Sequence, residues 1–260
     1  MTRWWQRWRR WKEQRVLTSR PIPDPLWHYT LARYPFLARL APSDAQELRR
    51  LSTLFLAEKE FTGAGGIAVT DEMAVAVAAQ ACLPVLKLGL QLYRGFVGIV
   101  MHADEVVARR EVMDETGVVH HYDEVLAGEA MDGGPVTLSW YDVQQASESA
   151  EVGYNVVIHE FVHKIDMLDG VADGIPPLQG RDEREAWATL MDEEFEQFCA
   201  DVDDGYETFL DPYGAEGVDE FFAVSAEAFF VAPADFRLAH PRLYIAFRDY
   251  FRQDPAALSA

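Results

Sequence analysis

Apolar positions recur at helical spacing over most of this chain of 260 residues. The pattern predicts helices over residues 27–34, 43–61, 71–83, 181–199, 220–230 and 241–251. Ser43, followed three residues later by Gln46, has the form of a capping box, so the second of these helices is predicted to begin there. Most of the chain is therefore expected to be helical.

The middle third has a different pattern. Short apolar runs rich in β-type residues predict strands over residues 96–101, 118–122 and 136–140. This order of elements predicts an α+β fold, mainly helical, in which helices pack on a small mixed sheet. Residues 136–140 have two interpretations. They form either an edge strand that binds an extended peptide through main-chain hydrogen bonds, or a purely structural strand.

Residues 1–20 differ in composition from the rest and are interpreted as a basic, Trp-rich extension, with residues 21–260 forming a single domain. The extension holds seven Arg or Lys and one Glu, a net charge of +6. Trp4, Trp8 and Trp11 fall at helical spacing. Because the rest of the chain is so acidic, we expect the Trp residues of the extension, including Trp5, to dock on the domain's own surface. The alternative is a helix that contacts anionic lipid or an acidic partner.

The formal net charge of −20 argues against a general nucleic-acid binder, because a phosphate backbone would be repelled. Cys82 and Cys199 lie in apolar surroundings and suggest neither a disulfide framework nor a Cys-based zinc site. No secretory signal is predicted. The longest apolar stretch, residues 74–92, is interrupted by polar residues and is not expected to span a membrane. A cytoplasmic location is the expectation.

The stretch GYNVVIHEFVHKIDMLD, residues 153–169, contains the pattern H-E-x-x-H at His159, Glu160 and His163. Residues four apart share one face of a helix, so the two imidazoles can bind one zinc ion. Glu160 can take a proton from a water held by that ion. The flanking residues are apolar, and two His and a Glu in a buried helix would be costly without a partner. A metal site is therefore preferred over a chance match on a surface helix.

A catalytic zinc site needs a third protein ligand. The long metzincin pattern would require Gly at position 166 and His at position 169, which are Asp166 and Asp169 here, so that class is excluded. The apolar helix at residues 220–230 offers Glu220 and Glu227. These are seven residues apart and lie on nearly one face. Spacing alone does not choose between them.

Several stretches together resemble the Mlc titration factor A family of zinc peptidases, from about Leu31 to Pro255. They are ACLPVLKLGL, GPVTLSWYDVQ, HEFVHKIDMLDG, DPYGAEGVDEFFAVSAEAFF and FRQDP, in this order. The resemblance implies a zincin-like domain in which the third zinc ligand is a Glu seven residues after a mechanistic Tyr, as in the similar catalytic part of anthrax lethal factor. That spacing falls on Tyr213 and Glu220. Glu227 and Asp166 then become candidates for orienting the ligand imidazoles.

The expected function is a zinc peptidase with one Zn²⁺ per chain. Glu160 would act as general base and Tyr213 would stabilise the oxyanion. Cleavage at chain ends, as by an aminopeptidase, and internal cleavage both stay open. The family resemblance also implies a partner, since its namesake in enterobacteria binds and inactivates the glucose repressor Mlc and so raises expression of a sugar phosphotransferase gene. The alternative function is therefore non-catalytic titration of a repressor, with a structural or vestigial zinc site.

Overall fold

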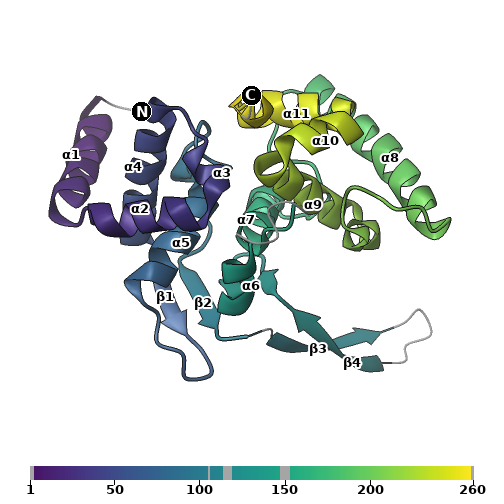
Figure 1. The fold of residues 1–260 in the computed structure, drawn as a ribbon, viewed down its shortest axis with the longest axis horizontal. Helices are drawn as coiled ribbons and strands as arrows, with labels where there is room; N and C mark the ends of the chain where they lie inside the picture. Colours follow the sequence, from purple (N-terminus) through teal and green to yellow (C-terminus); the bar gives the residue numbers. More distant parts are fainter. Residues whose placement is uncertain (1–2, 105, 114–118, 147–152, 259–260) are drawn as a thin grey trace.

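The computed structural model describes residues 3–104, 106–113, 119–146 and 153–258. Most of them are helical (Figure 1). The α-helices are α1 (Arg3–Ser19), α2 (Asp24–Arg33), α3 (Pro35–Ala38), α4 (Pro42–Glu58), α5 (Asp71–Cys82), α6 (Trp140–Gln145), α7 (Val156–Asp166), α8 (Arg181–Asp203), α9 (Val218–Val231), α10 (Pro233–Ala239) and α11 (Pro241–Phe251). Short 3₁₀ turns connect them, including η1 (Leu90–Tyr93), η3 (Met167–Asp169), η4 (Pro212–Glu216) and η5 (Pro255–Leu258).

A four-stranded mixed sheet lies beside α7. Its strands are β1 (Glu60–Gly63), β2 (Gly98–His102), β6 (Val136–Ser139) and β5 (Gly128–Ala130), in that spatial order. The first three are parallel, and β5 runs antiparallel to β6. Strands β3 (Val106–Met113) and β4 (Val119–Leu126) form a separate antiparallel hairpin that projects away from the helices (Figure 1). The predicted α+β class, mainly helical with a small mixed sheet, is confirmed.

Of the two interpretations given for residues 136–140, the peptide-binding edge strand is wrong. Strand β6 pairs with β2 on one side and with β5 on the other, so its main-chain groups are already used. The edge on this side of the sheet is β5, three residues long, which pairs with β6 alone among the described strands. A strand this short, with Gly128 at its start, carries too little pattern to be recognised from sequence.

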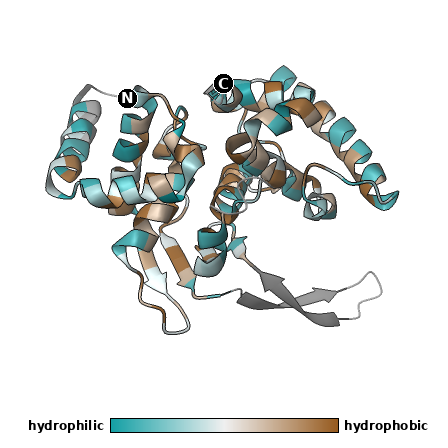
Figure 2. Ribbon diagram, in the orientation of Figure 1, coloured by the Kyte–Doolittle hydropathy of each residue, from teal (hydrophilic) through white to brown (hydrophobic). Residues whose placement is uncertain are grey.

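Helix α7 lies in the middle of the molecule, between the N-terminal helices and the group formed by α8 to α11 (Figure 1). Phe161 on α7 is fully buried and packs against the rings of Phe55, Tyr93 and Phe96 at centroid distances of 5.1–5.8 Å. Hydrophobic residues concentrate in α7 and α9 (Figure 2). The two helices that carry the candidate ligands are therefore built into the core, which fixes their relative position.

Local capping explains where two of these helices begin. The Asn155 side chain accepts a hydrogen bond from the Ile158 amide at 2.9 Å and starts α7. Helix α4 begins differently from the prediction, because Ala41 is its N-cap, Pro42 is its first residue and no side chain caps it. The prediction of a capping box at Ser43 and Gln46 is wrong. Proline at the first helical position has no amide that needs a partner, and the helix begins at Pro42 instead of Ser43.

The expected docking is also wrong for three of the four N-terminal tryptophans, and the side chain of the fourth, Trp5, lies outside the described part of the structure. Helix α1 packs along α4 through Val16 and Leu17, which lie against the hydrophobic core. Trp4, Trp8 and Trp11 keep 65%, 40% and 57% of their surface exposed. The helix is thus held through its C-terminal half, while Trp4, Trp8 and Trp11 stay exposed to solvent. Among the described residues, no helix is both long and apolar enough to cross a bilayer.

Candidate metal centre

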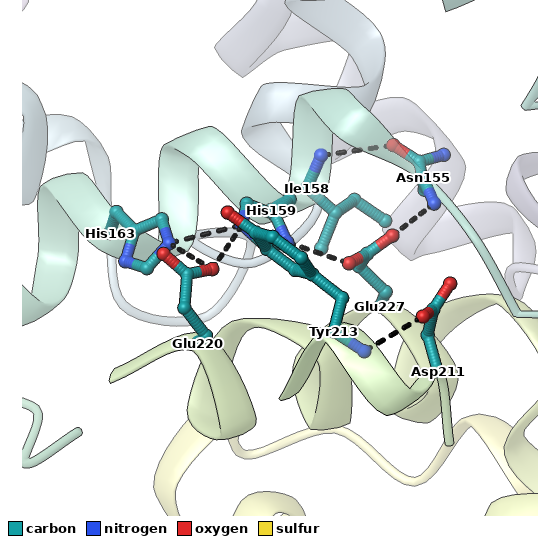
Figure 3. Close-up of polar contacts among 8 residues, drawn as sticks. All are labelled: Asn155, Ile158, His159, His163, Asp211, Tyr213, Glu220 and Glu227. Atoms are coloured by element: carbon teal, nitrogen blue, oxygen red, sulfur yellow. Dashed lines mark hydrogen bonds and ion pairs between the residues drawn. The ribbon is translucent and has the colours of Figure 1, made fainter. Parts of the chain in front are cut away.

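Three side chains from two helices converge at one point (Figure 3). His159 and His163 come from consecutive turns of α7, and Glu220 comes from the first turn of α9. The Glu220 Oε2 atom lies 2.9 Å from His159 Nε2 and 3.3 Å from His163 Nε2. The two Nε2 atoms are 3.1 Å apart. Of the two glutamates that spacing left open, Glu220 is therefore the one that completes this cluster.

The spacing of these donor atoms fits a zinc ion. Bonds of about 2.0–2.1 Å in a tetrahedral arrangement place neighbouring donors about 3.3 Å apart. The three observed separations, 2.9–3.3 Å, agree with that value to within a few tenths of an ångström. Two imidazole nitrogens and one carboxylate oxygen are also a common zinc donor set. The residues present fit the metal in both number and chemistry.

Glu227, one helical repeat after Glu220 on α9, lies behind His159 instead of at the cluster. Its Oε1 atom is 2.7 Å from His159 Nδ1, and its Oε2 atom accepts the main-chain N–H of Asn155. The carboxylate therefore fixes the imidazole so that Nε2 faces His163 and Glu220. Asn155 also caps α7. The same residue therefore contacts both the first turn of the helix and the carboxylate that orients His159.

The charges at this site favour a cation. Burial disfavours a charged imidazole, but hydrogen bonds to Glu220 and Glu227 outweigh it and raise the pKa of His159 well above its ordinary value. Burial acts against the Glu220 carboxylate as well, yet its hydrogen bonds with His159 and His163 dominate and hold its pKa well below the usual range. The surrounding carboxylates therefore stabilise positive charge between the two imidazoles, whether a proton or a metal ion supplies it.

Glu160 points toward a pocket instead of the ligand cluster. The pocket holds about 200 Å³ and is lined by His159, Glu160, Tyr213 and apolar residues of α9 and the loop before η4. Glu160 is 5% exposed, and burial raises the pKa of its carboxyl to about 7, against the influence of His159 and His163. A carboxyl group with a pKa in this range can accept and release a proton near neutrality.

Gly128 on β5 makes room for this carboxylate. A Cβ atom at Gly128 would lie 2.5 Å from Glu160 Oε1 and 2.7 Å from Glu160 Cγ. Any side chain at this position would displace Glu160 from its place beside the pocket. Sequence reasoning missed Gly128, and the only signal was a glycine within a short run of strand-like spacing.

Tyr213 lies on η4 with its ring 6.1 Å from that of His159, centroid to centroid. The Asp211 carboxylate accepts the Tyr213 amide at 2.9 Å and caps the turn (Figure 3). Gly214, next in sequence, is buried against Phe221 of α9. The turn is thereby packed on the helix that carries Glu220, which explains how a Tyr seven residues upstream reaches the same site.

Asp166, proposed to orient a ligand, contacts a different group. Its Oδ2 atom accepts the Gly174 amide at 3.0 Å. The Oδ1 atom is buried and has no hydrogen-bond partner among the described residues. Burial raises the pKa of this carboxyl to about 7. The structure thus gives Asp166 a role in holding the loop after α7, and it shows no hydrogen bond from Asp166 to His163.

A second residue that sequence reasoning missed is Asn155. Besides capping α7 and donating to Glu227, it donates from Nδ2 to Gln80 Oε1 on α5 at 2.8 Å. Both side chains are fully buried. An N-cap signal could have been read at Asn155, which directly precedes the apolar run that begins at Val156. Its link to Glu227, 72 residues away, could not.

The fold and the site together define a class: an α+β protein with an H-E-x-x-H helix beside a mixed sheet and a two-His, one-Glu candidate metal centre. The chain belongs to the glucose-regulated metallo-peptidase M90 family, whose sequence profile matches residues 8–252. It is 34% identical to Mlc titration factor A of Cronobacter sakazakii over 94% of this chain and 91% of that protein. Identity with Mlc titration factor A of Serratia proteamaculans is 35%, over 92% of each chain.

An uncharacterised protein of Synechocystis sp. is similar to the same degree, at 35% identity over 95% of this chain and 90% of its own length. The family resemblance expected from the sequence motifs is therefore confirmed over nearly the whole chain. The match begins at residue 8, so it includes most of α1.

Proposed function

We propose that this protein is a zinc-dependent peptidase, with one zinc ion held by His159, His163 and Glu220. The observation that carries the proposal is the convergence of these three donors beside a pocket that also contains Glu160 and Tyr213. A closed structural site would have four protein ligands, whereas the three found among the described residues leave a position for water or substrate. When bound, zinc would polarise a peptide carbonyl and lower the pKa of the attacking water.

Glu160 is the proposed general base. Its carboxylate takes a proton from the attacking water and then delivers that proton to the leaving amine. The pKa near 7 suits both steps, since the group must accept and release the same proton. Because Gly128 has no side chain, the Glu160 carboxylate has room to lie at the pocket wall.

Tyr213 is the proposed oxyanion donor. Its ring stands beside His159 on the open side of the cluster, and its side chain lines the pocket. A hydroxyl donor fixed by a packed turn stabilises the negative charge that develops on the carbonyl oxygen, with little reorganisation during the reaction.

Strand β5 is the proposed binding edge for an extended peptide. Ala127 and Gly128 line the pocket, and among the described strands β5 pairs with β6 alone, so its other side would offer main-chain groups to a peptide next to Glu160. This replaces the expected role of β6. Main-chain pairing is tolerant of sequence, so specificity would come from side-chain pockets such as the apolar wall at Phe209, Leu210 and Val224.

A second candidate function rests on the relatives named Mlc titration factor A. Their name supports the proposal that this chain also binds a transcriptional repressor of the Mlc type, which would place that role in the cytoplasm. Repressor binding would then either regulate the peptidase activity or be the protein's function without catalysis. In the second case the zinc site would be structural or vestigial.

The deciding experiment combines metal analysis with a peptide library whose members have either free or blocked N-termini. The wild type is expected to hold about one zinc per chain and to cleave a subset of the library. Glu160→Gln should keep its zinc and lose about 10²–10⁴-fold in turnover, because it retains the shape of the side chain but removes the base. Cleavage restricted to free N-termini would identify an aminopeptidase.

If the zinc-loaded wild type cleaves nothing while binding a repressor tightly, and Glu160→Gln binds it equally well, the peptidase proposal is wrong and titration stands. Loss of zinc from Glu160→Gln would instead show that this residue holds the metal.

A further inference from the structure

Helix α1 presents a stripe of three indole rings that are exposed to solvent over a large part of their surface. Trp4, Trp8 and Trp11 are exposed to 65%, 40% and 57%. At about 1.5 Å per residue, the stripe runs about 10 Å along the helix. Three large aromatic side chains so close together on one exposed surface are unusual, because single exposed hydrophobic residues are the norm.

The stripe lies opposite the face that holds α1 to the domain. Successive residues turn by about 100° around a helix, which places all three Trp within about 60° of each other. Val16 and Leu17 lie on the other side and pack on the core. An ion pair between Glu13 and Arg50 of α4, at 3.5 Å, holds the same side. The stripe is thus fixed outward by contacts made elsewhere on the helix.

Basic side chains accompany the rings. Arg7 and Arg15 share the exposed sector, and Lys12 flanks it, all three being exposed. Lys12 Nζ lies 3.7 Å from the centre of the Trp8 ring, and the Arg15 guanidinium lies 5.7 Å from that of Trp11. Cations and indoles therefore reach the same surface together.

We propose that this surface, Trp4, Arg7, Trp8, Trp11 and Arg15, binds an anionic lipid membrane. Indole rings favour the polar boundary of a bilayer, and arginine can bury its stem there while its head group contacts phosphate. The exposed sector carries no long aliphatic side chain, so contact would be shallow and would depend strongly on charge.

Shape and charge favour a membrane over a protein partner. Helix α1 stands at the outer edge of the molecule (Figure 1), and the stripe lies on the side of α1 away from Val16 and Leu17, so a flat surface could approach it. Residues 1–20 carry +6, whereas the other residues together carry −26. Repulsion between that acidic remainder and the lipid is screened beyond about 8–10 Å at physiological salt, so only the attached helix would experience the full attraction.

The test is co-sedimentation of the full-length protein with vesicles of phosphatidylcholine, with or without about 30% phosphatidylglycerol, at about 0.05 M and 0.5 M salt. We expect binding only to the anionic vesicles, and its loss at high salt. Arg7→Gln with Arg15→Gln should weaken binding about 25-fold, because each basic residue contributes about fivefold near an anionic surface. Trp4→Ala, Trp8→Ala and Trp11→Ala together should weaken it by at least about tenfold.

A matched control removes three exposed hydrophobic residues elsewhere, in Tyr141→Ala, Tyr206→Ala and Leu238→Ala. This variant should bind vesicles as the wild type does. Circular dichroism of every variant confirms that α1 and the domain are folded.

The proposal is overturned if the intact protein stays in the supernatant with anionic vesicles at low salt, or if the triple Trp variant binds as tightly as the wild type. It is also overturned if the protein self-associates without lipid and the triple Trp variant abolishes that association, since a second copy would then cover the stripe.

Discussion

Helices α7 and α1 both carry ring side chains one turn apart, His159 and His163 in one and Trp4 and Trp8 in the other. The outcomes are opposite. The two histidines face α9 and are nearly buried, whereas the two tryptophans face outward and are exposed. The same spacing therefore produces an internal site in one helix and an external surface in the other.

The difference comes from the number of neighbours. Helix α7 is packed by α5, α9 and the sheet, and the polar groups around His159 are paired with Glu220, Glu227 and Asn155. Helix α1 packs chiefly on α4, through residues in its C-terminal half. A buried polar cluster has to be satisfied from several elements at once, while an exposed stripe needs only one anchoring face.

The largest effect on the buried site is expected from Tyr213→Phe, which removes one hydroxyl group from the pocket beside His159. The quantity expected to change is kcat. If that hydroxyl stabilises the oxyanion, kcat should fall about 10²–10³-fold with little change in KM. Steady-state kinetics on a cleaved library peptide measures both, with zinc content as the control. A rise in KM at constant kcat would mean that the group binds substrate in its ground state instead.

The next effect separates the two glutamates of α9. Glu227→Gln should weaken zinc binding about 10–100-fold, because the carboxylate orients His159 without touching the metal. Glu220→Gln should weaken it more, since a donor at the centre is lost. Competition with a chelator measures both affinities. The reverse order would exchange the two assignments.

A smaller effect is expected from Gly128→Ala. The new Cβ would stand 2.5 Å from Glu160 Oε1, so the carboxylate has to shift. We expect turnover to fall about tenfold, because a misplaced base loses part of the 10²–10⁴-fold that general-base catalysis provides. Zinc content should not change. Gly133→Ala is the control, since its added Cβ meets nothing within 4 Å, although its positive φ of 59° makes that change mildly strained.

Local pattern was sufficient to predict the long helices and the two histidines of α7. It could not choose between Glu220 and Glu227, because both lie on one face of α9 and the choice depends on how α9 crosses α7. The family resemblance selected Glu220, and the structure brings that residue to the histidines. Strand β5 and Gly128 were not predicted. A strand of three residues is too short to show an alternation of apolar and polar residues, and the role of Gly128 depends on its contact with Glu160, which is distant in the sequence.

The prediction for the tryptophans failed for a related reason. The difference in net charge between residues 1–20 and the rest suggested docking, but charge is long-ranged and does not determine which side of a helix is covered. Val16 and Leu17 supply the apolar face that α1 buries, and they outweigh the general attraction of the acidic surface.

The smallest expected effect is that of Trp11→Ala on stability, and its contrast with Phe161→Ala tests whether α1 and α7 differ as the structure indicates. Trp11→Ala should change the free energy of unfolding by less than about 0.5 kcal/mol, because the ring is 57% exposed and surface changes are usually that small. Phe161→Ala on α7 should cost about 3–5 kcal/mol, because it leaves a cavity among Phe55, Tyr93 and Phe96. Denaturant unfolding of the two variants, followed by circular dichroism, gives both values. A loss above about 2 kcal/mol for Trp11→Ala would mean that the ring is packed in solution, and the stripe would no longer be available to bind lipid.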